Sequence, residues 1–298
     1  MTIPSYEGLK DSLRIPSSRV RLSTEHSKPQ NGLYILGVEI NNKYFGKKSI
    51  RFNRHLNCIC GKRETGKSYF YNLMRSAVNT NVPLDDGSVK LYMEMLENGQ
   101  RRFYAYCRDS KISRVELFQI DLENNKVQKI IEEGNEKTFP KPGFYIPARI
   151  NEVSENEEEL QKFLVKYFGE STIENADSFN KMFAIPVFLE NTTSQILKLE
   201  VNEGIFRLLF NVDWKISDNK EKFVDFFLLN KSQKRCAMVI ILIICSKFGP
   251  VSIDAPEEFL DNSDISKYLS PLIKKYKDFQ QINLFSSNPS LAVNSDPE

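Results

Sequence analysis

The residues best suited to chemistry form a short loop with two glycines, a lysine and a serine. The segment GKRETGKS, residues 61–68, fits the phosphate-binding pattern G-x-x-x-x-G-K-[ST]. Glycines let backbone N–H groups approach an anion closely, and the N-terminus of a following helix adds partial positive charge. Lys67 would contact the β- and γ-phosphates of a nucleotide, and the Ser68 hydroxyl would bind Mg²⁺. The predicted nucleotide contacts here are Gly61, Lys62, Arg63, Glu64, Thr65, Gly66, Lys67, Ser68 and Tyr69.

The segments on either side of this loop have the order that the pattern requires. Residues 55–60 are mostly apolar and predict a buried strand, and residues 68–78 place apolar side chains at helical spacing. The alternative is an ordinary strand, turn and helix without a ligand. Because pattern and context agree, we predict that the loop binds ATP.

A phosphate-binding loop also needs a carboxylate at the end of another core strand to hold Mg²⁺. Asp254 ends a short apolar stretch, so Ser68 and Asp254 are the predicted metal ligands. Glu257 and Glu258 follow closely and are the candidate catalytic carboxylates. Just upstream, residues 228–249 are predicted to form a helix because of their length and the Gly-Pro stop, and the apolar run 236–245 within them is predicted to be a buried core element.

Composition restricts the class of protein. A chain of 298 residues with 41% hydrophobic residues suits one large domain or a domain with an insertion. The net charge of +2 gives no general signature of nucleic-acid binding, although a local basic face remains open. The chain opens with polar residues instead of a signal peptide, and its longest apolar run is about half a membrane span. Its five cysteines suit reduced thiols, so we expect a cytoplasmic protein that does not associate with a membrane.

The remaining sequence divides into a polar start and one large domain. Residues 1–31 are polar with three prolines and predict an extension or linker, and residues 32–298 form the predicted domain. Residues 32–40 and 48–53 predict a strand pair, and residues 88–108 predict a hairpin that turns at Asn-Gly.

Two later segments carry weaker patterns. Residues 154–169 have a helical period with an acidic first turn, and the whole stretch 154–227 is predicted to be a mainly helical insert. Residues 280–296 predict a strand, a loop and a further short strand.

The order of motifs resembles the ATPase heads of the ABC and SMC superfamily. The nearest likeness is the AAA-like ATPase module that follows PHP phosphoesterase domains in the TrlF family: DAPEEFLDN (254–262) is similar to DQPED-LDN, and SSNPS (286–290) to THNAN. Residues 8–22 resemble the segment that joins the PHP domain to that module. The resemblance covers both ends of the chain and is weakest over 154–227. Because no PHP domain and no coiled-coil arm are found, it implies an armless head with a separate partner.

The resemblance also implies which hydrolytic groups are replaced. The residue after the magnesium aspartate is usually the glutamate that orients water; here it is Ala255, and the TrlF-type acid two residues later corresponds to Glu257. Ser287 stands at the switch-histidine position, and Ala148 or a neighbour replaces the magnesium-sensing glutamine. The signature L-S-G-G-Q becomes LNKSQ (229–233). The residues implied to contact ATP on an opposite subunit are Lys231, Ser232 and Gln233.

These features together predict an α/β P-loop NTPase of the ABC/SMC head type, with a mixed β-sheet, an antiparallel β subdomain and a mainly helical insert. We expect it to bind ATP and Mg²⁺, to form a homodimer through ATP, and to hydrolyse ATP slowly or not at all, because groups that position water account for most phosphoryl-transfer catalysis. The resemblance implies that it gates an effector or nuclease in trans, in bacterial phage defence or DNA repair.

Three alternatives remain open at this point. One is an active ATPase that uses Glu257 or Glu258 to drive nucleic-acid processing, and another is an ATP-locked scaffold without turnover. The third is a P-loop kinase, which is disfavoured because the sequence has no evident acceptor-binding lid.

Overall fold

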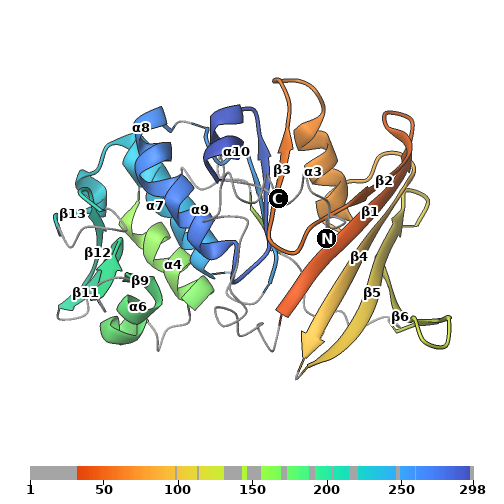
Figure 1. The fold of residues 1–298 in the computed structure, drawn as a ribbon, viewed down its shortest axis with the longest axis horizontal. Coiled ribbons are helices and arrows are strands. Elements are labelled where there is room, and N and C mark those ends of the chain that lie inside the picture. Colours follow the sequence, from red (N-terminus) through yellow and green to blue (C-terminus); the bar gives the residue numbers. More distant parts are fainter. Residues whose placement is uncertain are drawn as a thin grey trace, which may run out of the picture.

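A computed structural model describes residues 32–97, 99–112, 114–130, 143–145, 156–168, 173–187, 192–202, 205–214, 221–245, 249–258 and 260–295. The predicted extension, residues 1–31, lies outside these ranges. A large antiparallel sheet, a central parallel sheet and a helical region with two small antiparallel sheets, β10-β9 and β11-β12-β13, follow one another across the molecule (Figure 1). None of the helices in the described part of the chain has the length and apolar content needed to cross a membrane.

The central sheet has the strand order β3-β15-β14-β8, and all of its strand pairs are parallel. The strands are β3 (Leu56–Cys60), β15 (Ile282–Ser286), β14 (Val251–Asp254) and β8 (Gly143–Tyr145). Every residue of β14 and β15 is buried, as expected of parallel strands with both faces covered. The carboxyl ends of β3, β15 and β14 meet at one edge, so the segments that follow them meet there too.

Helices from opposite ends of the chain pack against this sheet. The helix α7 (Lys231–Cys245) supplies the main hydrophobic core, in which residues 236–244 are all buried. The helix α3 (Lys67–Ser76) packs on the other side, where Phe70 and Tyr71 contact the Phe285 ring at centroid distances of 5.8 and 5.2 Å. Leu284 belongs to the α7 core and Phe285 to the α3 core, because successive residues of a strand face opposite sides.

The large antiparallel sheet has the order β2-β1-β4-β5-β6-β7 and shares its core with α3. Its strands are β1 (Gly32–Asn42), β2 (Gly46–Arg51), β4 (Ser88–Glu97), β5 (Gln100–Asp109), β6 (Glu116–Asp121) and β7 (Lys126–Lys129). The strand pair and the hairpin predicted from the sequence are confirmed, and Gly99 has the positive φ of 78° that the tight turn needs.

The segment 154–227 is helical only in its first part. The helices α4 (Glu157–Phe168) and α6 (Ala176–Phe183) are followed by β9 (Ala184–Val187), β10 (Thr192–Gln195), β11 (Leu197–Asn202), β12 (Ile205–Asn211) and β13 (Phe223–Asp225). The prediction of a mainly helical insert is therefore wrong from residue 184. In β11, Leu197 and Leu199 are buried whereas Glu200 is exposed, an alternation of period two that only a strand produces.

The C-terminal segment also differs from its prediction. After β15 the chain forms the helix α10 (Pro289–Ser295), not a further strand. Pro289 occupies the first helical turn, and the Asn288 side chain accepts a hydrogen bond from the Ser290 N–H at 2.9 Å. Proline at the start and an asparagine cap are both favourable for a helix, and this local chemistry outweighs the β-type residues beyond it.

Three short helical segments complete the described fold. The 3₁₀-helix η2 (Phe226–Leu228) precedes α7, and α8 (Asn262–Asp264) and the π-helix η3 (Ile265–Leu269) lead into α9 (Ser270–Tyr276).

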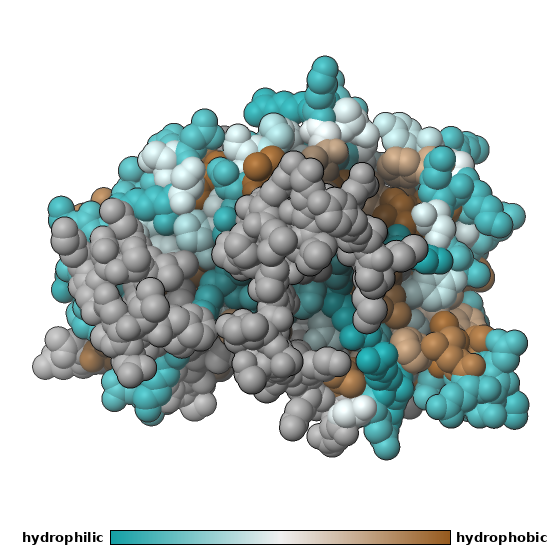
Figure 2. Space-filling model, viewed as in Figure 1, coloured by the Kyte–Doolittle hydropathy of each residue, from teal (hydrophilic) through white to brown (hydrophobic). Residues whose placement is uncertain are grey.

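On the face shown in Figure 2, the coloured surface is mostly hydrophilic, and hydrophobic side chains appear in small separate areas.

Candidate functional site

A cleft of about 830 Å³ lies at the carboxyl edge of the parallel sheet. It brings together the segments that follow β3, β14 and β15, and it includes most of the predicted site. The residues that line it are Tyr44, Arg63, Glu64, Gly66, Lys67, Ser68, Tyr69, Asp254, Ala255, Glu257, Glu258, Leu260, Phe285 and Ser287.

The loop between β3 and α3 has the conformation that its glycines predict. Gly66 has a φ of 88°, a left-handed conformation that strains any residue with a Cβ atom, and a Cβ atom built on it would lie 2.9 Å from the Tyr44 ring. The Gly66 carbonyl accepts a hydrogen bond from the Phe70 N–H at 2.8 Å, which starts α3 directly after the loop. Glu64 also has a positive φ, 64°. The backbone thus turns sharply around the N-terminus of a helix.

The Lys67 side chain folds back and binds the backbone of this loop. Its Nζ donates hydrogen bonds to the Gly61 and Lys62 carbonyls at 2.7 and 2.6 Å, and Thr65 Oγ1 donates to the same Lys62 carbonyl at 2.8 Å. The ammonium group therefore lies over the loop that precedes α3. Lys62 and Thr65 are exposed, but their side chains do not line the cleft.

Ser68 and Asp254, the predicted metal ligands, are brought together. Asp254 is 8% exposed, and a hydrogen bond from Ser68 reaches its carboxylate. Burial raises the pKa of Asp254 above its ordinary value, and the charges of Glu257 and Glu258 act in the same direction. The Ser68 hydrogen bond and the Lys67 charge oppose this rise in pKa. A bound cation would likewise favour the ionised form of Asp254 and lower its pKa.

The segment after β14 turns sharply back toward β15. Ala255 has a φ of 49°, and its N–H donates to the Phe285 carbonyl at 2.8 Å. The Glu258 N–H then donates to the Ala255 carbonyl at 3.1 Å. This turn carries Glu257 to the end of β15.

The Glu257 carboxylate is held there by one residue. Its Oε1 accepts hydrogen bonds from the Ser287 N–H at 2.7 Å and from Ser287 Oγ at 3.0 Å. Its Oε2 is buried, and no donor among the described residues lies within hydrogen-bond distance of it. Glu258, in contrast, is exposed and interacts electrostatically with Arg235. Burial lowers the pKa of the Arg235 guanidinium to about 10, and the Glu258 charge acts against that decrease.

The signature-like turn before α7 has a structural role that the sequence did not predict. The Asn230 side chain accepts from the Gln233 N–H at 2.8 Å, and the Gln233 side chain accepts from the Asn230 N–H at 3.3 Å. This reciprocal pair is a capping box. Ser232 is buried, donates to Asp264 Oδ2 at 2.5 Å and accepts from the Asp261 N–H at 3.0 Å.

Two of the three residues predicted to contact ATP of an opposite subunit, Ser232 and Gln233, thus make internal bonds where a helix start must satisfy its N–H groups. The contact of this turn with an opposite subunit stays a prediction. Lys231 is exposed. None of the three lines the cleft, and Ala148 lies outside the described residues.

The structure adds one residue that the sequence did not suggest. Tyr44, in the turn between β1 and β2, is 61% exposed and meets the predicted Tyr69 edge-on, with ring centroids 5.4 Å apart. Both rings line the cleft beside Gly66. A Tyr-Phe pair in an otherwise polar turn was the available signal, but only the fold shows that this turn lies next to the loop.

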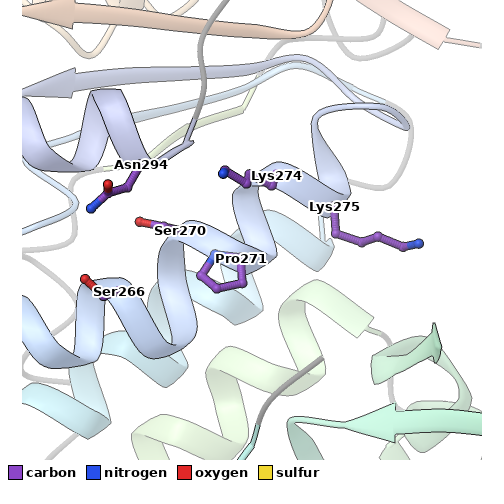
Figure 3. A pocket seen from close by; sticks show the side chains of 6 residues that line it. All are labelled: Ser266, Ser270, Pro271, Lys274, Lys275 and Asn294. Carbon is purple, nitrogen blue, oxygen red and sulfur yellow. The ribbon is translucent and has the colours of Figure 1, made fainter. Parts of the chain in front are cut away.

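A second pocket, of about 520 Å³, is separate from this site. Ser266, Ser270 and Lys274 project from η3 and α9 toward Asn294 of α10, while Lys275 points away from them (Figure 3). It contains no predicted site residue, so the cleft at the sheet edge is the candidate functional site.

Similar proteins are found among solved structures alone: no protein-family model and no curated protein matches the sequence. An SMC head domain from Thermotoga maritima aligns with a TM-score of 0.56 at 13% identity, covering 88% of this chain and 92% of that one. The fold is that of an SMC head. An SMC head bound to the C-winged helix domain of ScpA gives a TM-score of 0.58 at 12% identity, covering 88% of this chain and 93% of that one.

A third SMC head confirms the same fold. The Pyrococcus furiosus head with an extended coiled coil, bound to the C-terminal domain of ScpA, aligns with a TM-score of 0.52 at 12% identity, over 89% of this chain and 92% of that one. The predicted α/β P-loop fold of the ABC/SMC head type is confirmed. The nearer likeness to the TrlF module stays a prediction.

Proposed function

We propose that this SMC-type head binds ATP with Mg²⁺, pairs with a second copy around the nucleotide, and thereby gates a partner protein while hydrolysing ATP slowly. The observation that carries the proposal is the cleft itself. It unites Lys67 at the start of α3 with a buried carboxylate, Asp254, that is hydrogen-bonded to Ser68. Lys67 and Ser68 are neighbours at the start of α3, whereas Asp254 comes from a segment far away in sequence, and each of the three fits a different part of a magnesium nucleotide.

The triphosphate would lie against the loop and the N-terminus of α3. Backbone N–H groups there favour an anion, and Lys67 would exchange its two carbonyl partners for phosphate oxygens. The Tyr44 and Tyr69 rings border the same cleft and offer faces for a base.

The donor set also fits Mg²⁺. The Ser68 hydroxyl and the Asp254 carboxylate are hard oxygen ligands of the kind that Mg²⁺ prefers, with phosphate oxygens and water completing its coordination. A bound cation would also offset the cost of the buried Asp254 charge. When bound, the metal supplies positive charge that neutralises the phosphates.

Slow hydrolysis is proposed because the position next to the metal carboxylate cannot orient water. Ala255 has no polar side chain, and Ser287 replaces a histidine with a shorter group. These changes affect groups needed in the transition state and leave the ground-state phosphate contacts intact. Tight binding with little turnover is the expected combination.

Pairing through ATP is supported by the fold and by the exposed start of α7. In this proposal Lys231 and the first amides of α7 approach the phosphates bound by a second copy, as an isologous contact. Leu228, 79% exposed, lies just before this turn and would be covered in the pair.

The wider role rests on the resemblance to ATPase heads of this kind. SMC heads have been solved with domains of ScpA bound, so heads of this fold can carry partner proteins. For this chain we propose an effector or nuclease partner in bacterial phage defence or DNA repair.

The second candidate function is an active ATPase that drives nucleic-acid processing. One observation favours it: the Glu257 carboxylate is held at the cleft by two hydrogen bonds from Ser287, which is how a working acid or base would be positioned. Turnover faster than about one per minute would support this candidate over the slow head.

The experiment that tests nucleotide binding uses Lys67→Ala. Loss of this charged contact should weaken magnesium-ATP binding about tenfold or more, measured by calorimetry. Lys48→Ala, which removes an exposed lysine from β2, serves as the control and should leave the affinity unchanged. Equal affinities for Lys67→Ala and the parent protein would contradict the assignment.

A further inference from the structure

The pocket between α9 and α10 is separate from the nucleotide cleft and is lined by polar side chains from two segments. Ser266, Ser270 and Lys274 project from η3 and α9 toward Asn294 of α10 (Figure 3), and the pocket has a volume of about 520 Å³. The first three residues are spaced four positions apart, as are side chains that share one face of a helix. A pocket of this size has room for a small metabolite.

The Ser270 hydroxyl lacks the hydrogen bond that a buried helical serine normally makes. Ser270 is 4% exposed, and no partner for its Oγ is found among the described residues. Such a serine usually donates to the carbonyl one turn earlier, as Ser76 of α3 does to the Leu73 carbonyl at 2.8 Å. Ser270 therefore has a free donor in the wall of a pocket, which a ligand could use.

The local backbone explains why Ser270 differs from Ser76. Ser270 directly follows the π-helix η3, and its N–H donates to the Ile265 carbonyl, five residues back. The wider π turn shifts the serine relative to the carbonyl that its hydroxyl would otherwise reach. Single π turns of this kind are rare, and they are frequent at functional sites because they place a side chain where a regular helix would not.

The charge of the lining favours an anion. Lys274 is exposed and projects toward Asn294, whereas the next residue, Lys275, points away (Figure 3). None of the described residues that line the pocket is acidic. The ammonium group of Lys274, the two serine hydroxyls and the Asn294 amide all offer hydrogen-bond donors, and phosphate oxygens are strong acceptors for such donors.

The same lining disfavours a magnesium nucleotide. The pocket has no described carboxylate that could hold the metal, in contrast to Asp254 in the cleft. One ammonium group that faces the pocket also matches a single phosphate group better than a triphosphate. The pocket therefore differs from the cleft in the ligand that its residues can bind.

We propose that this pocket binds a phosphate group, either free or carried by a small molecule such as a sugar phosphate. Lys274 pairs with the phosphate charge, Ser270 donates from the buried wall, and Ser266 and Asn294 bind from the exposed rim. The site does not depend on nucleotide binding in the cleft, so either function can fail without the other.

The test is calorimetric titration with ribose 5-phosphate, inorganic phosphate and ribose, in the absence of ATP and Mg²⁺. Ribose 5-phosphate or inorganic phosphate should bind with a Kd below about 1 mM, and ribose should give no signal. Lys274→Ala should weaken binding about tenfold or more, because a charged contact is lost. Lys67→Ala, in the cleft, should retain this binding, which separates the pocket from the phosphate-binding loop.

Two further variants examine the neighbouring side chains. Ser270→Ala should weaken binding about threefold and yet raise the melting temperature without ligand, because it removes a buried hydroxyl that has no partner. Ser76→Ala is the matched comparison and should lower the melting temperature, since its hydroxyl is bonded. Lys275→Ala should leave the Kd within about twofold, because its side chain points away from the pocket.

The two phosphate probes distinguish the sources of the ligand. Tighter binding of ribose 5-phosphate would identify a small phosphate ester, and equal affinities would identify free phosphate. Three results would overturn the proposal. They are no binding of either probe up to about 10 mM, binding that is lost in Lys67→Ala but kept in Lys274→Ala, and equal losses in Lys274→Ala and Lys275→Ala.

Discussion

At the scale of single residues, the site contains a buried carboxylate, Asp254, whose charge lowers the stability of the fold when no ligand is bound. Asp254 is 8% exposed, and burial raises its pKa. A carboxylate with a raised pKa lowers the stability of the folded protein at pH values above that pKa. Such a residue is favourable only when a cation or hydrogen-bond donors compensate for its burial.

Asp254→Asn should therefore raise the melting temperature in the absence of ATP and Mg²⁺. Above the raised pKa the full cost of the charge is present, so the gain is largest near neutral pH. The gain should shrink as the pH falls through the raised pKa, and it should vanish below the ordinary value of 3.8, where the parent carboxyl is protonated in both states. Thermal melts at several pH values measure it.

The same variant should bind ATP less well in magnesium, with a much smaller loss in EDTA, because the amide is a poorer metal ligand. Equal losses of affinity in the two buffers would show that Asp254 is only a structural residue of the strand end.

How far the sequence predicts the site depends on how local each feature is. Lys67 and Ser68 belong to one continuous loop, and Asp254 follows a recognisable strand, so all three were predictable. The Glu257–Ser287 contact joins residues 30 positions apart, and its geometry depends on the turn at Ala255. Tyr44 depends on the packing of a turn against Gly66. Such contacts between distant segments leave no periodic signal in the sequence.

At the scale of elements, the start of α7 is a short sequence that resembles a ligand-binding motif and also caps the N-terminus of the helix. The segment LNKSQ resembles a degenerate signature loop, and yet Asn230 and Gln233 satisfy the first N–H groups of α7. Ser232 meanwhile ties α7 to the start of α8 through Asp261 and Asp264. The side chains of this turn therefore serve the start of α7, whatever its backbone N–H groups contact.

Asn230→Ala should lower the free energy of unfolding by about 1 kcal/mol, because it removes the helix cap. Urea denaturation measures the change. Lys231→Ala, next to it and exposed, is the control and should stay within about 0.5 kcal/mol of the parent. Indistinguishable denaturation midpoints for Asn230→Ala and the control would mean that the capping box contributes nothing.

The elements predicted correctly are those with a long apolar run or with a clear turn sequence at one end. The helix α7 was identified by the length of its apolar run, and the hairpin β4–β5 by its Asn-Gly turn. β9, β10 and β13 were missed because each has only three or four residues, and β11 was missed although LKLEVN (197–202) alternates without a break. Their pairing, for example Leu199 with Leu208, brings together residues that only a folded sheet joins.

At the scale of the whole molecule, the nucleotide cleft lies where two sheets meet. Gln281, fully buried just before β15, joins them: its Oε1 accepts from the Ile35 N–H of β1 at 2.7 Å, and its Nε2 donates to the Ile35 carbonyl at 2.7 Å. The antiparallel sheet is thus bonded to the parallel sheet at the amino end of β15, the end opposite the cleft. A nucleotide that contacts Tyr44 on one side and Asp254 on the other would bridge both.

The most direct test of the account is sedimentation velocity at micromolar protein, with and without ATP and Mg²⁺. We expect a monomer without nucleotide and a dimer with it, and the dimer should persist because hydrolysis is slow. Lys231→Glu should remain monomeric, since it sets like charge against phosphate, whereas Lys274→Glu, the same charge change on α9, should still form the dimer. A parent protein that binds magnesium-ATP at saturation and stays monomeric would contradict the pairing mechanism.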